Sequence, residues 1–146
     1  WLLDSRLPTV TLRMNRQSKN AQRIAEGLQG HPALRRILYP SLITDPEQIR
    51  IRDAQCDFPG GIMTLDLKGG KMAAFTFLRS LRILRDAVSL GGVESLACHP
   101  KTTTHSELSP EDMERAGITD SLVRISIGIE DWRDLLRDIR DGLDAI

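Results

Sequence analysis

Residues 122–127 read Leu-Val-Arg-Ile-Ser-Ile, and this stretch decides how the rest of the chain is interpreted. Apolar and polar residues alternate in it, which is typical of a β-strand with one buried face because successive side chains point to opposite faces. The apolar residues of the stretch are therefore expected to face the core. Arg124 and Ser126 are expected to share the opposite face.

An arginine set in a strand is well suited to holding a planar carboxylate, because its guanidinium can donate two parallel hydrogen bonds. The same spacing allows a structural ion pair between Arg124 and an acid such as Glu130 or Asp131. Taken alone, the residues leave both interpretations open.

Helices and further strands are predicted on both sides of this stretch. Upstream, residues 62–67, 87–90 and 95–98 are strand candidates, and residues 73–84 fit a helix with a broad apolar face. Downstream, Asp131 stands near the start of a helix. The apolar residues on one face of that helix are Trp132, Leu135, Leu136, Ile139 and Leu143.

The first part of the chain follows the same alternation of helix and strand. Apolar residues at helical spacing predict one amphipathic helix over about 7–28, and a short strand is expected at 34–39. Residues 41–58 look like a long polar loop, which the turn at 59–61 closes. The fold class is therefore α+β, with a small, mainly antiparallel sheet of about four strands and helices packed on one face.

Composition excludes several classes of function. The 146 residues suit one domain, and the 20 basic and 20 acidic residues cancel, so no sustained field favours nucleic acid or a membrane. No apolar run approaches the roughly 20 residues of a membrane span. Cys56 and Cys98 are far apart and indicate neither a disulfide framework nor a zinc site, which favours a cytoplasmic protein.

Two polar segments could carry chemistry. The glycine pair in Ser89-Leu-Gly-Gly-Val-Glu-Ser-Leu96 permits a backbone shape that places amide groups beside a ligand, although a plain turn between strands explains it as well. Residues 101–106 are dense in hydroxyl groups. His99 and His105 have no third ligand at a recognisable spacing, so no metal or general-base role is assigned to them. Self-contained catalytic motifs are absent.

Three motifs in order resemble the C-terminal domain of the Cys/Met metabolism PLP-dependent enzyme family, which includes cystathionine γ-lyases, cystathionine γ-synthases and methionine γ-lyases. The motifs are residues 89–96, then His99-Pro-Lys-Thr-Thr-Thr-His-Ser106, then Gly117-Ile-Thr-Asp-Ser-Leu-Val-Arg-Ile-Ser-Ile-Gly-Ile-Glu-Asp131. The resemblance covers nearly the whole chain. It departs from the family at residues 5–10, Ser-Arg-Leu-Pro-Thr-Val, where the family commonly has Arg-Gly-Leu-Lys-Thr-Leu.

The resemblance implies roles for four substrate-binding residues. Arg124 falls on the family's arginine for the substrate α-carboxylate, and Ser89 is expected to assist it. Glu94 falls where many members that catalyse γ-elimination or γ-replacement carry an acid near the distal end of the substrate. Thr104 lies in a segment that borders the active site.

The resemblance also implies that residues 1–146 are a single C-terminal substrate-binding domain of a fold-type I PLP enzyme, beginning with an interdomain helix. The chain opens at Trp1 rather than at methionine, which suggests part of a longer protein. In the family, the cofactor lysine and the phosphate-binding residues belong to a preceding large domain. None of the four lysines, Lys19, Lys68, Lys71 and Lys101, matches that lysine motif, so the isolated chain is expected to lack PLP and activity.

For the complete enzyme, the resemblance implies a trans-sulfuration enzyme of cysteine and methionine metabolism that forms a homotetramer. Its expected reaction is γ-elimination or γ-replacement on a sulfur-containing amino acid such as cystathionine or methionine, or on an activated homoserine. Two alternatives from other classes stay open. One is a stand-alone amino-acid-binding or assembly module without catalysis, and the other is a purely structural domain in which Arg124 forms an ion pair.

Overall fold

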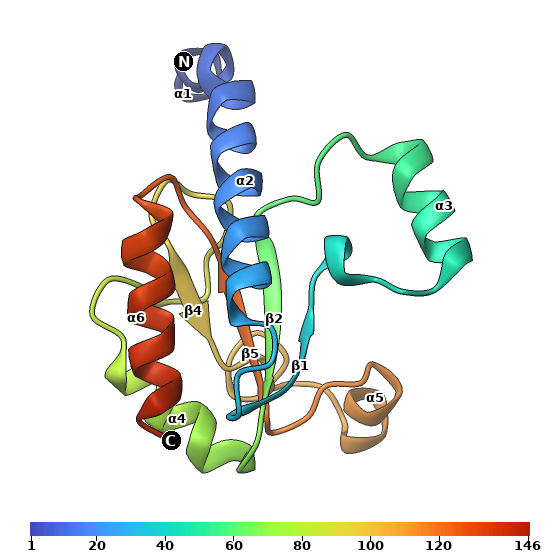
Figure 1. The fold of residues 1–146 in the computed structure, drawn as a ribbon, viewed down its shortest axis with the longest axis vertical. Helices are drawn as coiled ribbons and strands as arrows, with labels where there is room; N and C mark the ends of the chain where they lie inside the picture. Colours follow the sequence, from blue (N-terminus) through green and yellow to red (C-terminus); the bar gives the residue numbers. More distant parts are fainter.

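The computed structural model describes residues 1–146 and arranges six α-helices, three short 3-10 helices and five strands (Figure 1). In chain order they are α1 Leu2–Arg6, η1 Leu7–Thr9, α2 Val10–Leu28, β1 Leu34–Leu38, η2 Pro40–Leu42, α3 Pro46–Gln55, β2 Ile62–Leu67, α4 Gly70–Ser80, β3 Arg85–Asp86, β4 Leu96–Cys98, η3 Pro100–Thr102, α5 Pro110–Arg115, β5 Leu122–Ser126 and α6 Trp132–Asp144. No helix is both long enough and apolar enough to cross a membrane.

The strands form one sheet in the order β1-β2-β5-β4-β3, in which only β3 and β4 run parallel. This confirms the predicted α+β class and the mainly antiparallel sheet. Strand β5 lies at the centre of the sheet, where Arg124 is in register with Thr64 of β2 and Cys98 of β4. The arginine is therefore carried by the most enclosed strand.

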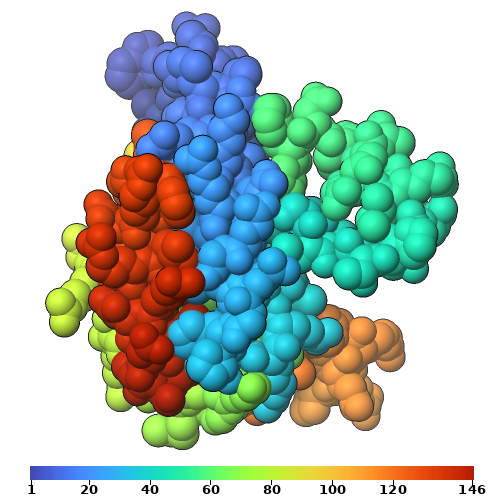
Figure 2. Space-filling view, viewed as in Figure 1, coloured from blue at the N-terminus to red at the C-terminus, as the bar shows by residue number.

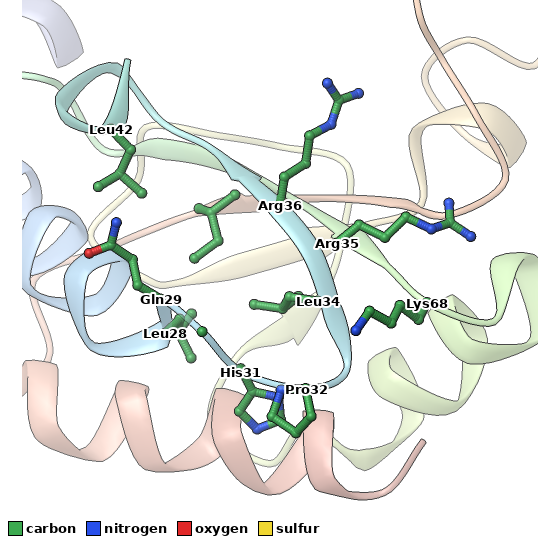
Figure 3. Close-up of a pocket in the computed structure, with 11 residues that line it drawn as sticks. Leu28, Gln29, His31, Pro32, Leu34, Arg35, Arg36, Leu42 and Lys68 are labelled. Carbon is green, nitrogen blue, oxygen red and sulfur yellow. The ribbon is translucent and has the colours of Figure 1, made fainter. Parts of the chain in front are cut away.

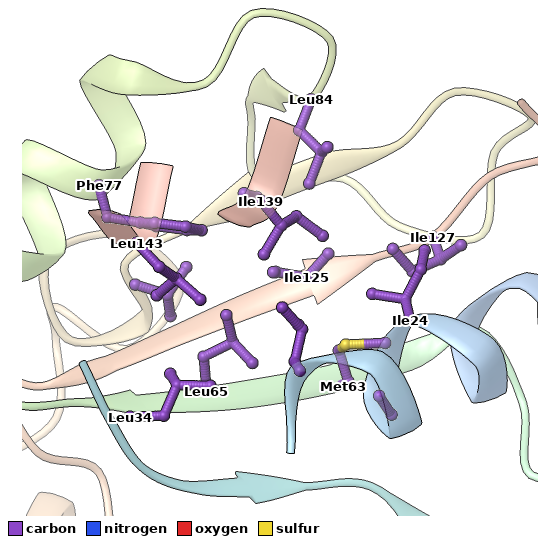
Figure 4. Packing of buried hydrophobic residues seen from close by; sticks show 14 of the residues in the cluster. Ile24, Leu34, Met63, Leu65, Phe77, Leu84, Ile125, Ile127, Ile139 and Leu143 are labelled. Atoms are coloured by element: carbon purple, nitrogen blue, oxygen red, sulfur yellow. The ribbon is translucent and has the colours of Figure 1, made fainter. Parts of the chain in front are cut away.

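Helices α2, α4 and α6 cover one face of the sheet, and the core lies between them and the strands (Figures 1 and 4). Val123 and Ile125 of β5 are fully buried there, as the alternation predicts, and they pack in one cluster with Ile24 of α2 and Ile139 of α6. Burial of side chains of this size stabilises the fold by about 1.5–3 kcal/mol each. The opposite face is left to Arg124 and its neighbours.

Two predicted boundaries in the first part of the chain are wrong. The helix expected over about 7–28 begins three residues later, at Val10, because residues 7–9 form a 3-10 turn containing Pro8, which has no backbone N–H to donate. The expected loop over 41–58 contains α3, which Asp45 caps by accepting a hydrogen bond from the Gln48 N–H at 2.8 Å. No residue of α3 is buried, so the helix leaves no apolar pattern in the sequence.

Two further boundaries shift around α4. The helix ends at Ser80 rather than at residue 84, because the buried carboxylate of Asp138 on α6 accepts the backbone N–H groups of Arg82, Ile83 and Leu84 at 2.8–3.1 Å. The strand expected at 87–90 is also wrong, and β3 occupies Arg85–Asp86 instead. Residues 88 and 89 use their carbonyl groups to bind the side chain of Arg124.

Candidate functional site

Arg124 is half-buried on β5, with its guanidinium held by backbone carbonyl groups rather than by an acid. Its Nη2 donates to the carbonyl oxygens of Val88 at 2.6 Å and Ser89 at 3.1 Å. The other two guanidinium nitrogens have no hydrogen-bond partner in the protein. Because no carboxylate neutralises the charge, the guanidinium is oriented by the chain and remains able to bind an anion.

The acids that the sequence allowed as partners of Arg124 have other functions. Asp131 caps α6 by accepting the Arg133 N–H at 2.8 Å. Glu130 accepts both the backbone N–H of Ser95 at 2.6 Å and its hydroxyl at 2.8 Å. The structural ion pair of Arg124 is therefore not formed.

Residues 88–95, called the glycine turn below, lie beside Arg124 and are bound to the same strand. Gly91 adopts a φ of 74°, a left-handed conformation that a residue with a side chain adopts only at a cost. Its N–H donates to Oγ of Ser126 at 2.9 Å, so the two polar residues of β5 bind the same segment. Ser126 is almost completely buried, and sequence reasoning placed it correctly on the face of Arg124 without assigning it a role.

Helix α2 holds the turn from its other side. The buried side chain of Gln17 donates through Nε2 to the carbonyl oxygen of Gly92 at 2.7 Å. One turn further along the helix, Nδ2 of Asn20 donates to the carbonyl oxygens of Gly128 at 3.2 Å and Glu130 at 2.9 Å. Nothing in the sequence distinguished these amides from other polar helix residues, because their burial depends on segments more than 70 residues away.

The far end of the turn packs tightly against the residues that follow β5. The Gly128 N–H donates to Oγ of Ser95 at 2.8 Å, and the Ile129 N–H donates to the carbonyl oxygen of Val93 at 2.9 Å. A Cβ atom on Gly128 would overlap that carbonyl oxygen of Val93. Residue 128 is therefore a glycine because the two backbone segments approach too closely for a side chain.

The structure brings three of the four predicted substrate-binding residues to one region. Ser89 is exposed and contacts Arg124 through its carbonyl group. Glu94 is exposed at the other end of the same turn, close to Gly92, and forms no ion pair. Thr104 lies on a separate segment, where its hydroxyl pairs with Nδ1 of His105 at 2.8 Å, and no hydrogen bond joins it to Arg124.

His99 is buried with both ring nitrogens occupied. Its Nε2 lies 3.0 Å from the carbonyl oxygen of Asp120, to which it donates, and its Nδ1 lies 2.8 Å from Oγ1 of Thr102, from which it accepts. Beside it, the hydrogen bond of 2.8 Å from Lys101 lowers the pKa of the Asp120 carboxyl below its ordinary value. These contacts fasten the hydroxyl-rich segment to the start of β5. The structure contains no cluster of three potential metal ligands.

A separate hollow of about 360 Å³ lies between β1 and the end of α2 (Figure 3). Leu34 and Leu28 form part of its apolar lining, and Arg35, Arg36 and Lys68 are its charged residues. Arg36 is already paired with Asp66 through a contact of 3.2 Å. Arg124 does not line this hollow.

The fold and the site together define a class of α+β domain that presents an arginine, free of acidic partners, beside a glycine turn, an arrangement that can hold a carboxylate. The chain belongs to the Cys/Met metabolism PLP-dependent enzyme family, whose sequence pattern matches residues 1–144. This confirms the family indicated by the three motifs.

Individual relatives agree with this assignment. The chain is 43% identical over 145 residues to an L-methionine γ-lyase of Pseudomonas deceptionensis, covering 99% of this chain and 36% of that protein. It is 39% identical over 146 residues to an O-succinylhomoserine sulfhydrylase of Pseudomonas aeruginosa, covering 100% of this chain and 36% of that protein. The chain thus spans about a third of the length of the curated relatives it matches.

Solved structures show the same fold. A cystathionine γ-synthase from Xanthomonas oryzae pv. oryzae, in complex with aminoacrylate and cysteine, superposes with a TM-score of 0.88 at 41% identity, covering 94% of this chain and 35% of that one. A cystathionine γ-lyase from Micromonospora echinospora superposes with a TM-score of 0.86 at 38% identity, covering 93% and 35% of the two chains. The similarity therefore extends over almost the whole of this chain.

Proposed function

We propose that this chain is the C-terminal substrate-binding domain of a PLP-dependent trans-sulfuration enzyme that acts on a sulfur-containing amino acid. The complete enzyme, meaning the longer protein of which this chain would form part, catalyses γ-elimination or γ-replacement on cystathionine, methionine or an activated homoserine. The observation that carries the proposal is the guanidinium of Arg124, which two backbone carbonyl groups orient and no acid neutralises. Family membership supports the chemistry.

In this proposal, each site residue acts on a different part of the substrate. Arg124 holds the α-carboxylate by charge and by the N–H groups that make no bond within the protein. Ser89, whose carbonyl already contacts the guanidinium, assists in placing that carboxylate. Glu94, exposed and unpaired at the other end of the turn, lies near the distal end of the substrate, and Thr104 borders the site.

In this proposal, the residues of this chain do not themselves form a PLP site. A covalent link to PLP needs a lysine whose amine is free to react. Lys101 is paired with Asp120 at 2.8 Å, and Lys71 lies over the ring of Phe75. Lys19 and Lys68 are exposed, but neither lies in the cofactor-lysine motif of the family. In the complete enzyme, bound PLP supplies an electron sink for negative charge at the substrate carbons. The contribution of this chain is to bind and orient the substrate.

The test of the proposal is the variant Arg124→Met in the complete enzyme, with Arg140→Met as the matched control. Arg140 is also an arginine whose Nη2 donates to a backbone carbonyl, that of Gly27 at 2.6 Å. Losing a hydrogen-bonded charge should raise KM for the amino acid about 10- to 100-fold in Arg124→Met. Arg140→Met should leave KM unchanged. Equal KM values in the two variants would remove Arg124 from the site.

Product analysis then separates the possible reactions. Thiol release from methionine, cleavage of cystathionine and thiol uptake onto an activated homoserine are measured side by side on the complete enzyme. Light scattering of the same preparation tests the proposed homotetramer. If the coding region upstream provides no PLP-binding domain and the chain binds amino acids without turnover, the stand-alone binding module is correct instead.

A further inference from the structure

Gln17 of α2 is a fixed hydrogen-bond donor to the glycine turn. Its side chain is 1% exposed, and Nε2 lies 2.7 Å from the carbonyl oxygen of Gly92, with a longer contact of 3.5 Å to that of Gly91. A Cβ atom built on Gly61 would lie 3.2 Å from Cβ of Gln17, so the backbone at Gly61 packs directly against the glutamine side chain. The amide thus has little freedom to leave the turn.

The turn that Gln17 holds is the same segment that orients Arg124. Gly91 is bound on one side by Ser126 of β5, and Gly92 on the other side by Gln17. The carbonyl groups of Val88 and Ser89, which precede these two glycines in the same turn, accept the two hydrogen bonds of the guanidinium. Because Gly91 and Gly92 have no side chains, the backbone there depends on these external contacts for its position.

We propose that Gln17 is a positioning residue for the carboxylate site and acts on the substrate only through the turn and Arg124. This inference rests on the proposed function. Removing the amide leaves the Gly92 carbonyl without its partner, so that Ser126 alone holds the two glycines of the turn. The carbonyl groups of Val88 and Ser89 then hold the guanidinium less firmly. The affinity for the carboxylate falls, while the groups that carry out the chemistry are untouched.

The experiment uses Gln17→Met in the complete enzyme, with Gln22→Met as the matched control on the same helix. Gln22 is exposed, and its amide donates to Glu26 at 3.0 Å, far from the turn in sequence. One neutral hydrogen bond corresponds to about a 2- to 12-fold change in binding. KM of Gln17→Met should rise within that range with kcat nearly unchanged, and Gln22→Met should match the unmodified enzyme.

A substrate analogue without the α-carboxylate distinguishes positioning from a general structural role. Inhibition by this amine should be the same in Gln17→Met and in the unmodified enzyme, because the amine does not use Arg124. In an Arg124→Met background, Gln17→Met should add little to KM, since both changes act on one interaction. The positioning role is wrong if Gln17→Met weakens binding of the amino acid and of the amine equally, or if it leaves KM unchanged.

The outcomes separate this inference from the function on which it rests. If Arg124→Met raises KM and Gln17→Met does not, the positioning role fails and the carboxylate site stands. If Arg124→Met has no effect, both fail together. Should Gln17→Met not fold, Gln17→Glu keeps the length of the side chain and places an acceptor against the Gly92 carbonyl, and it should raise KM at least as much.

Discussion

The carboxylate of Glu130 accepts two hydrogen bonds from Ser95, one from the backbone N–H at 2.6 Å and one from the hydroxyl at 2.8 Å. The same hydroxyl oxygen accepts the N–H of Gly128 at 2.8 Å. Ser95 is fully buried, so these bonds are shielded from water. This pair therefore joins the end of the glycine turn to the segment that follows β5.

Ser95→Ala should destabilise the domain by about 1–3 kcal/mol, because the Gly128 N–H loses its partner in a buried place and Glu130 loses one of its donors. Urea unfolding of the chain measures this as a lower midpoint at an unchanged slope. Ser106→Ala is the control, since that exposed hydroxyl donates only to the nearby carbonyl of Thr103. Equal midpoints for the two variants would contradict the prediction.

Gly128→Ala should disturb the turn more than an alanine substitution usually does. The added methyl group would overlap the carbonyl oxygen of Val93, so the backbone must shift at a cost of about 1–3 kcal/mol or more. Gly27→Ala is the comparison, because its methyl group meets only the flexible side chain of Leu136, at 2.9 Å. The prediction is wrong if urea unfolding finds the two variants equally stable.

Glu94→Gln should affect substrates according to the charge at their distal end. Cystathionine carries an ammonium group beside a carboxylate there and methionine carries neither, and an exposed carboxylate attracts an ammonium group by about 0.2–1 kcal/mol. In the complete enzyme, kcat/KM for cystathionine should fall up to about fivefold, with that for methionine nearly unchanged. Glu107→Gln, at another exposed acid, is the control. An equal loss for both substrates would place Glu94 away from the distal end.

Lys101→Met should raise the pKa of the Asp120 carboxyl towards its ordinary value of 3.8, because the hydrogen bond from Lys101 is the main cause that lowers it. A carboxyl whose pKa is lower in the folded state stabilises the fold above its unfolded pKa and loses that contribution as pH falls through the folded pKa. As pH falls below about 3.8, the variant should therefore lose less stability than the unmodified protein does. NMR titration of the Asp120 carboxyl measures the shift, and an unchanged pKa would contradict the assignment.

The sequence predicted the parts of the fold that carry a repeating apolar pattern. The alternation around Arg124 and the helical face of α6 both match the structure, because burial on one side leaves a signature along the chain. Helix α3 has no buried face and was missed for that reason. The strand expected at 87–90 was wrong because a tertiary contact, the guanidinium of Arg124, takes the carbonyl groups of that segment.

The candidate site was predicted less completely than the fold. Arg124 and the glycine turn were recognised, and the structure places them in contact. The contributions of Gln17 and Ser126 could not be predicted, because a buried amide and an exposed one look the same until the distant segments that cover them are known. The sequence allows Glu130 as a partner of Arg124, but the structure joins it to Ser95.

The contacts around the glycine turn join segments from opposite ends of the chain. Asn20 binds the carbonyl of Glu130 across 110 positions, and Gln17 binds that of Gly92 across 75. Contacts at such separations carry the loop-closure cost that slows folding, so they form after the local helices. On a ribosome, α2 emerges long before β5 and its following residues exist. The arginine therefore acquires its orientation only after β5 and the residues that follow it have been synthesised.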